Sequence, residues 1–116
     1  MIIQFELDNP PSKKNRWSVA HGRIYTPYEI KKWMKQARAV VKEAVPEGLK
    51  VPVENNIVLM LAYYGKKDLD NVLSTICDML QGVLIKNDKQ VACVQAVKIP
   101  MKAEKVTVIV GVLNEV

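Results

Sequence analysis

Three aspartates in the second half of the chain have the residue type and spacing of a candidate metal site. Asp68 and Asp70 lie two positions apart in KKDLDNVLSTICDML, residues 66–80, and Asp88 follows in IKNDKQ. If the three side chains converge, their like charges repel one another strongly unless a cation neutralises them. Hard carboxylate oxygens favour Mg²⁺, which can activate water and stabilise charge on an attacked phosphodiester. The pattern therefore raises the hypothesis of metal-dependent phosphodiester hydrolysis.

Each of these aspartates also has an ordinary structural explanation. Asp68 precedes a predicted helix, where aspartate commonly caps free backbone amides, and Asp70 falls in the first turn, where the helix dipole favours negative charge. Asn87-Asp88 is typical of a turn between a helix and a strand. A helix of about 13 residues spans roughly 20 Å, so Asp88 reaches the others only if its loop or strand runs back beside the helix start. The residue types alone leave both explanations open.

Basic residues concentrate in a different part of the chain. The net charge is +5, and residues 13–38 hold 8 of the 17 basic residues against a single acid, Glu29. Lys66 and Lys67 directly precede Asp68, where they could hold a phosphate backbone. A basic surface apart from a carboxylate cluster suits a protein that attracts a polyanion, although a solvated face is the simple alternative. The eight basic residues are Lys13, Lys14, Arg16, Arg23, Lys31, Lys32, Lys35 and Arg38.

Composition limits the class of protein. With 116 residues, 49% hydrophobic and 25% charged, we expect residues 1–116 to form one globular domain. No apolar run approaches the ~20 residues of a membrane span, and the N-terminus lacks signal-peptide features, so we expect a cytoplasmic protein without membrane association. Cys77 and Cys93 are 16 residues apart and His21 is the only histidine. This pattern predicts buried free thiols rather than a zinc site.

Hydrophobic patterns predict four strands. Residues 2–8 alternate between apolar and polar, as in a strand with one wet face. Residues 57–64 are apolar without alternation, which predicts a central strand covered on both faces. Two further strands are predicted over residues 90–99 and 105–113. Between the first strand and the first helix, the prolines and polar residues of segment 9–23 predict irregular structure.

Two helices are predicted between these strands. The first begins near residue 26, where Thr26, Pro27 and Glu29 form a start signal, and it continues to about residue 45. The second covers residues 69–81, with an apolar stripe at helical spacing. The element order is therefore βαβαββ. It predicts an α+β fold in which a mixed four-stranded sheet carries two main helices.

The motif that contains the aspartates is similar to a known family signature. The segment KKDLDNVLSTICDMLQGVLIKNDKQV, residues 66–91, resembles that of the RusA-type Holliday junction resolvases, with a D-L-D-N helix start and an aspartate within N/D-D-x-x-V. NPPSKKNRW and HGRIYTP resemble the family's P-P-S-x-N entry and Gly-Arg loop. The resemblance covers nearly the whole chain, in the expected order.

This resemblance implies a small homodimeric, Mg²⁺-dependent endonuclease of bacterial, phage or prophage type, in which Mn²⁺ can substitute. It implies binding of four-way DNA junctions by shape and symmetric nicking of two opposed strands, in DNA recombination and repair. By position, Asp68, Asp70 and Asp88 match the catalytic, metal-binding aspartates. The apolar run at residues 106–113 is either a surface for the second copy or part of the interior. The residues expected to bind DNA are Lys13, Lys14, Arg16, Arg23, Lys66 and Lys67.

Asp78, Ser74 and Asn87 are the other positions at which this chain is compared with the family pattern. Asp78 matches a further frequent aspartate, but it lies two turns beyond the second aspartate of the motif, which favours a structural role. Ser74 stands where family members commonly place a catalytic lysine, and Asn87 replaces the first of two aspartates. Serine cannot supply positive charge to the transition state, although Lys66, Lys67 or Lys86 could substitute. The alternative prediction is therefore a junction- or branched-DNA-binding protein with weak or no nuclease activity.

Overall fold

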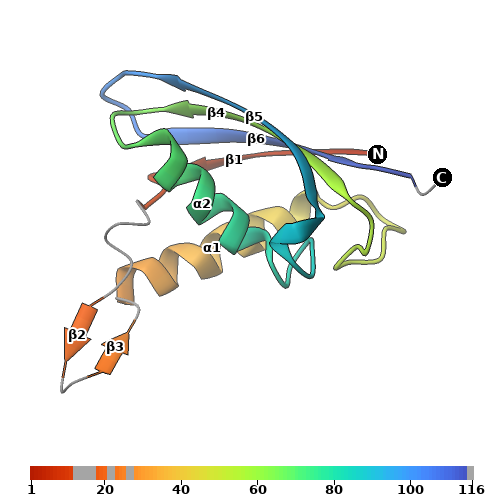
Figure 1. Cartoon of the computed structure of the whole chain (residues 1–116), viewed down its shortest axis with the longest axis horizontal. Coiled ribbons are helices and arrows are strands. Elements are labelled where there is room, and N and C mark those ends of the chain that lie inside the picture. The colour runs from red at the N-terminus through yellow and green to blue at the C-terminus, as the bar shows by residue number, and fades with distance from the viewer. Residues whose placement is uncertain (12–17, 21–22, 26–27, 115–116) are drawn as a thin grey trace.

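The structure, a computed structural model, describes residues 1–11, 18–20, 23–25 and 28–114, with side chains for 1–11 and 28–114. Four strands form one sheet, and two helices pack against it (Figure 1). The predicted α+β class is confirmed, as is the four-stranded mixed sheet. Neither helix of the described ranges is long and apolar enough to cross a membrane.

The strands of the main sheet lie in the order β1-β6-β4-β5. Their bounds are Ile2–Asp8 for β1, Ile57–Tyr64 for β4, Val91–Ile99 for β5 and Lys105–Val112 for β6. β6 pairs antiparallel with β1 and β4, whereas β4 and β5 are parallel. A parallel pair needs a crossover connection, which the second helix supplies. The predicted strands agree with these bounds to within one residue.

Only one face of the sheet is covered. Leu59, Leu61 and Tyr63 of β4 point into the core, while Met60 on the opposite face is 44% exposed. The prediction that this strand is covered on both faces is therefore wrong. The physical reason is that both helices lie on the same side of the sheet, so the other side remains open (Figure 1).

The final strand β6 resolves the two alternatives for the apolar run at residues 106–113. Val106, Val108 and Val110 are buried in the core that the sheet shares with the helices. Thr107 and Ile109 point to the opposite, open face, where they line an apolar groove. One face of this strand is therefore interior, and the other is accessible.

The helices agree closely with the periodicity. α1 (Tyr28–Ala44) buries Ile30, Ala37 and Val41. α2 (Leu69–Leu80) ends one residue before the predicted end at residue 81. Arg38 of α1 donates from Nε to the carbonyl oxygen of Met79 at 3.0 Å, and so satisfies a free carbonyl at the end of α2. The predicted start signal at residues 26 and 27 lies outside the described residues.

A small hairpin was not predicted. β2 (Ser18–Ala20) lies within segment 9–23, which was expected to be irregular. It pairs antiparallel with β3 (Arg23–Tyr25), which begins at the last residue of that segment. Strands of three residues are too short to produce a recognisable alternation. Both cysteines are free, as predicted. Their predicted burial is wrong, because Cys93 is exposed and Cys77 is only partly buried.

Candidate active site

A surface pocket of about 330 Å³ runs along α2 to the start of β5. Asp70, Ser74 and Asp78 recur at four-residue intervals, so α2 presents them on one face. Asp88 joins them from the turn before β5. Two of the three predicted aspartates, Asp70 and Asp88, therefore line the same pocket, whereas Asp68 does not. The lining residues are Asp70, Leu73, Ser74, Cys77, Asp78, Asp88 and Val91.

The crossover from β4 to β5 explains how Asp88 reaches this pocket. α2 leaves the end of β4 and runs back along the sheet, so that its second half lies near the start of β5 (Figure 1). Burial raises the pKa of the Cys77 thiol, and the nearby carboxylates of Asp78 and Asp88 raise it further. Asp88 therefore approaches the middle and end of α2, and the acidic pocket extends along the helix from Asp70.

The side chain of Asp68 does not have the capping role that its position suggests. Asp68 occupies the N-cap position of α2 with an extended backbone (φ −62°, ψ 127°), but its carboxylate makes no capping hydrogen bond. Instead, Asp68 Oδ2 accepts a hydrogen bond of 3.3 Å from Asn71 Nδ2. The carboxylate is thus exposed at the start of the helix, outside the lining of the pocket.

The turn that carries Asp88 is held by its neighbours. Asn87 Oδ1 caps the short 3₁₀ helix Asp88–Gln90, and Gln90 Oε1 accepts in return from the Asn87 amide at 3.0 Å. Gln90 Nε2 also donates to the carbonyl oxygens of Val53 at 2.9 Å and Asn55 at 2.8 Å. The side chains of Asn87 and Gln90 therefore stabilise the turn, and none of these hydrogen bonds involves the Asp88 carboxylate. Sequence reasoning missed Gln90, although a capping-box spacing from Asn87 would have indicated it.

The donor chemistry of the pocket fits Mg²⁺. Asp70 and Asp88 supply hard carboxylate oxygens, and Ser74 adds a hydroxyl. In the described part of the chain, no three His, Cys, Asp or Glu side chains form a group that could hold a metal ion by themselves. Mg²⁺ is commonly bound by only one or two carboxylates together with water and substrate phosphate oxygens. Asp70 and Asp88 are sufficient in number for that mode of binding.

The two lysines before the motif differ in their surroundings. Lys67 Nζ donates to the carbonyl oxygen of Pro10 at 2.8 Å and lies 3.8 Å from the Glu104 carboxylate, so it is engaged within the fold. Lys66 is exposed, and its ammonium group makes no hydrogen bond or ion pair with the rest of the described chain. The side chains of Lys13, Lys14, Arg16 and Arg23, which were also predicted to bind DNA, lie outside the described residues.

These features define an α+β domain that presents a carboxylate pocket on a crossover helix, next to a basic loop. A family model described as endodeoxyribonuclease RusA matches residues 8–111. The chain therefore belongs to the RusA endodeoxyribonuclease family, which acts on Holliday junctions. The match includes all three pocket carboxylates, Asp70, Asp78 and Asp88. No curated protein matches the chain in a direct sequence comparison.

Asp78 lines the same pocket, two helical turns from Asp70. The structural role predicted for it stays a prediction. Asp78 also bonds within the fold, since its Oδ1 accepts from Gln81 Nε2 at 3.5 Å. The four-residue spacing of Asp70, Ser74 and Asp78 was the available signal, but only the shape of the pocket shows how far along the helix it extends.

Proposed function

We propose that this protein is a structure-selective endonuclease that binds four-way DNA junctions and nicks two opposed strands symmetrically by Mg²⁺-dependent hydrolysis. Its proposed role is in DNA recombination and repair. The observation that supports this proposal is the placement of Asp70 and Asp88 in one pocket, in a chain of an endodeoxyribonuclease family. Both residues belong to the sequence motif, and their shared position in one pocket supports the proposal.

The residues of the pocket have separate proposed roles. Asp70 and Asp88 would hold the metal ion, and Asp68, exposed at the start of α2 outside the pocket lining, is the third carboxylate of the motif. Mg²⁺ held there would supply positive charge to the scissile phosphate and would lower the pKa of a water bound to it. Lys66 is free to contact the phosphate backbone, which positions DNA without reading its sequence. Lys67 contributes to the same basic surface but is held in place by Glu104.

We also propose a homodimer. Symmetric cuts in a two-fold junction are most simply made by two sites related by a two-fold axis. The open face of the sheet carries a groove of about 280 Å³ in which no lining residue is charged. Val97 at 51% and Ile99 at 40% exposure extend this apolar surface along the edge strand β5. A second copy that covers β5 would remove this surface from water.

A second candidate function is junction binding with little or no cleavage. Ser74 lines the pocket one helical turn from Asp70, where family members commonly have a lysine. Without that cation, charge on the transition state is less stabilised, while binding through backbone phosphates remains. This candidate predicts salt-sensitive binding of four-way junctions without nicks.

The test is to incubate the full-length protein with a labelled synthetic four-way junction and with a linear duplex of the same sequence. The reactions contain Mg²⁺, Mn²⁺ or EDTA. Paired nicks at symmetric positions, dependent on the metal and absent from the duplex, would support the endonuclease. Tight junction binding without nicks would favour the second candidate. Failure to bind the junction in low salt would reject both functions.

A further inference from the structure

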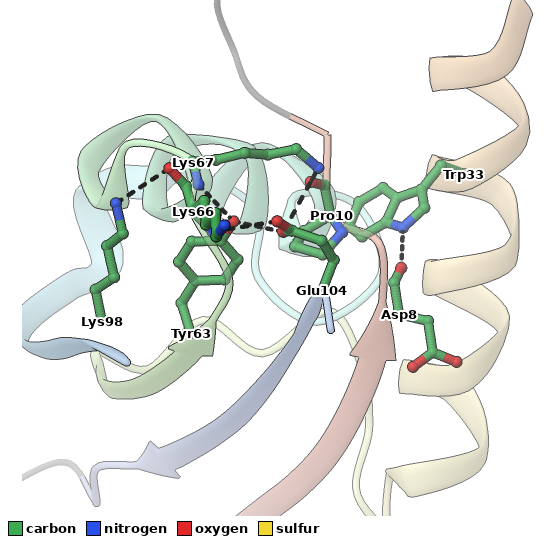
Figure 2. A network of polar contacts seen from close by, with 8 residues as sticks. All are labelled: Asp8, Pro10, Trp33, Tyr63, Lys66, Lys67, Lys98 and Glu104. Atoms are coloured by element: carbon green, nitrogen blue, oxygen red, sulfur yellow. Dashed lines mark hydrogen bonds and ion pairs between the residues drawn. The ribbon is translucent and has the colours of Figure 1, made fainter. Parts of the chain in front are cut away.

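We infer that Tyr63 and Glu104 are positioning residues for the segment Lys66–Asp68, through which the chain passes from β4 into α2. This inference rests on the proposed nuclease function and deepens it. The two residues come from different strands, since Tyr63 is near the end of β4 and Glu104 directly precedes β6. Figure 2 shows them side by side, next to Lys66 and Lys67 of this segment.

Two consecutive backbone amides are held by this pair. The Lys66 amide donates to Glu104 Oε1 at 3.1 Å, and the Lys67 amide donates to the Tyr63 hydroxyl at 2.8 Å. The Tyr63 hydroxyl in turn donates to Glu104 Oε2 at 2.5 Å. Every polar side-chain atom of the pair therefore bonds to the segment or to the other member of the pair.

The pair lies so close to the backbone at Gly65 that this position has no room for a side chain. A Cβ atom on Gly65 would overlap with Glu104 Oε2 and the Tyr63 hydroxyl oxygen, and would lie 2.6 Å from Tyr63 Cζ. A side chain at this position would therefore displace the pair, whereas glycine lets the backbone approach it this closely. Tyr63 itself is completely buried, which leaves its ring no freedom to move away.

Further contacts tie the same segment to the ends of two other strands. Lys67 Nζ donates to the Pro10 carbonyl oxygen just beyond β1, and Lys98 Nζ of β5 donates to the Lys66 carbonyl oxygen at 3.2 Å (Figure 2). The Gly65 amide donates to the Ile99 carbonyl oxygen at 3.1 Å. Gly65, Lys66 and Lys67 are therefore bonded to residues that lie in, or next to the end of, each strand of the main sheet.

This anchoring fixes the entry into α2, whose start has no side-chain cap. The side chain of Asp68 makes no capping hydrogen bond at the start of α2. The Asp68 carbonyl oxygen already accepts from the Val72 amide at 3.1 Å, so α2 begins directly after the two anchored amides. Any displacement of Lys67 therefore moves Asp68, and with it the first turn of α2 that carries Asp70. Mutation of groups that orient metal-binding residues commonly lowers activity by about 10–100-fold.

The protonation states of the pair suit this role at neutral pH. Burial raises the pKa of Tyr63 to about 12, and the bond to Glu104 raises it as well, so the hydroxyl stays protonated and can donate. Burial alone would raise the pKa of Glu104, but the bonds from Tyr63 and the Lys66 amide and the charge of Lys67 lower it overall. Glu104 is therefore ionised and accepts from its donors.

The experiment compares Tyr63→Phe, Glu104→Gln and Glu104→Ala with the full-length wild-type protein. Glu6→Gln is the matched control, because Glu6 is an exposed carboxylate that pairs with Lys105 at 3.5 Å on the neighbouring strand. A second control, Ile57→Val, removes one buried methyl group and lowers stability without touching the segment. The measurements are junction nicking at saturating Mg²⁺, junction affinity, melting temperature and amide hydrogen exchange at Lys66 and Lys67.

We expect Tyr63→Phe and Glu104→Ala to nick about 10–100-fold more slowly, with junction affinity within about threefold of wild type. Exchange at the two amides should accelerate in both variants. Glu104→Gln keeps one acceptor oxygen and should retain more activity than Glu104→Ala. Wild-type nicking rates in Tyr63→Phe, or an equal loss in a destabilised Ile57→Val, would overturn the inference.

The outcome for the wild type separates this inference from the proposed function. If the wild-type protein binds junctions but does not nick them, the nuclease proposal fails, and amide exchange alone then decides the anchoring. Faster exchange at Lys66 and Lys67 in Tyr63→Phe, but not in Glu6→Gln, would support it. Unchanged exchange in Tyr63→Phe would overturn it.

Discussion

Replacement of Asp70 by asparagine separates the catalytic role of this carboxylate from its structural one. Asp70 is exposed and lies in the first turn of α2, where a negative charge interacts favourably with the helix dipole. Loss of that interaction at an exposed site costs about 0.3–1 kcal/mol. Domains of this size are typically stable by about 5–15 kcal/mol, so Asp70→Asn should remain folded.

The expected effect on catalysis is much larger. If Asp70 holds the metal ion at the scissile phosphate, its loss removes several kcal/mol of transition-state stabilisation. A loss of about 4 kcal/mol corresponds to a roughly 10³-fold slower reaction. Junction binding should change little, because phosphate contacts by basic residues supply most of the affinity. The prediction is thus a folded protein that binds junctions and does not cut them.

The assay is single-turnover nicking of a four-way junction, with junction affinity and a urea titration measured on the same preparation. Glu29→Gln is a suitable control, since Glu29 is the acidic residue in the first turn of α1 and lies away from the pocket. It should lose a similar, small amount of stability and keep its nicking rate. If Asp70→Asn cuts within tenfold of the wild-type rate, the assignment of Asp70 to the metal is wrong.

Three further predictions test the pocket and the fold. Ser74→Lys places a cation one turn from Asp70 and should raise the nicking rate by roughly tenfold or more; an unchanged rate would indicate that another lysine already supplies the charge. Ile76→Ala should destabilise the protein by about 2–5 kcal/mol in urea titrations, because Ile76 is fully buried; a smaller loss would mean that the core collapses around the cavity. The third concerns pH. The pKa of Glu104 lies below its ordinary value of 4.5, so its ionised form stabilises the fold above that pH and the contribution is lost as pH falls through the folded value. The difference in unfolding free energy between wild type and Glu104→Gln should therefore shrink below pH 4.5, and a difference that persists in acid would contradict this reasoning.

Local patterns in the chain were enough for most of the elements. The alternation of β1 and the apolar stripe of α2 each repeat over several turns or residue pairs, so the periodic signal exceeds the noise of single residues. The D-L-D-N motif was also recognisable from the sequence, because the order of its residues along the chain indicates the family without any coordinates. The three-residue strands β2 and β3 are the counterexample, because so short an element has no periodicity to detect.

Contacts between distant segments were decided only by tertiary structure. The run at residues 57–64 is equally apolar at every position, so nothing in it tells which face the helices cover; their packing on one side leaves Met60 exposed. Asp70 and Asp88 line the same pocket because β4 and β5 are parallel and α2 runs back between them, an arrangement that no local pattern encodes. Glu104 is 38 positions from the Lys66 amide that it holds. Sequence periodicity reports on neighbours along one element, whereas these partners are brought together by the order of the strands.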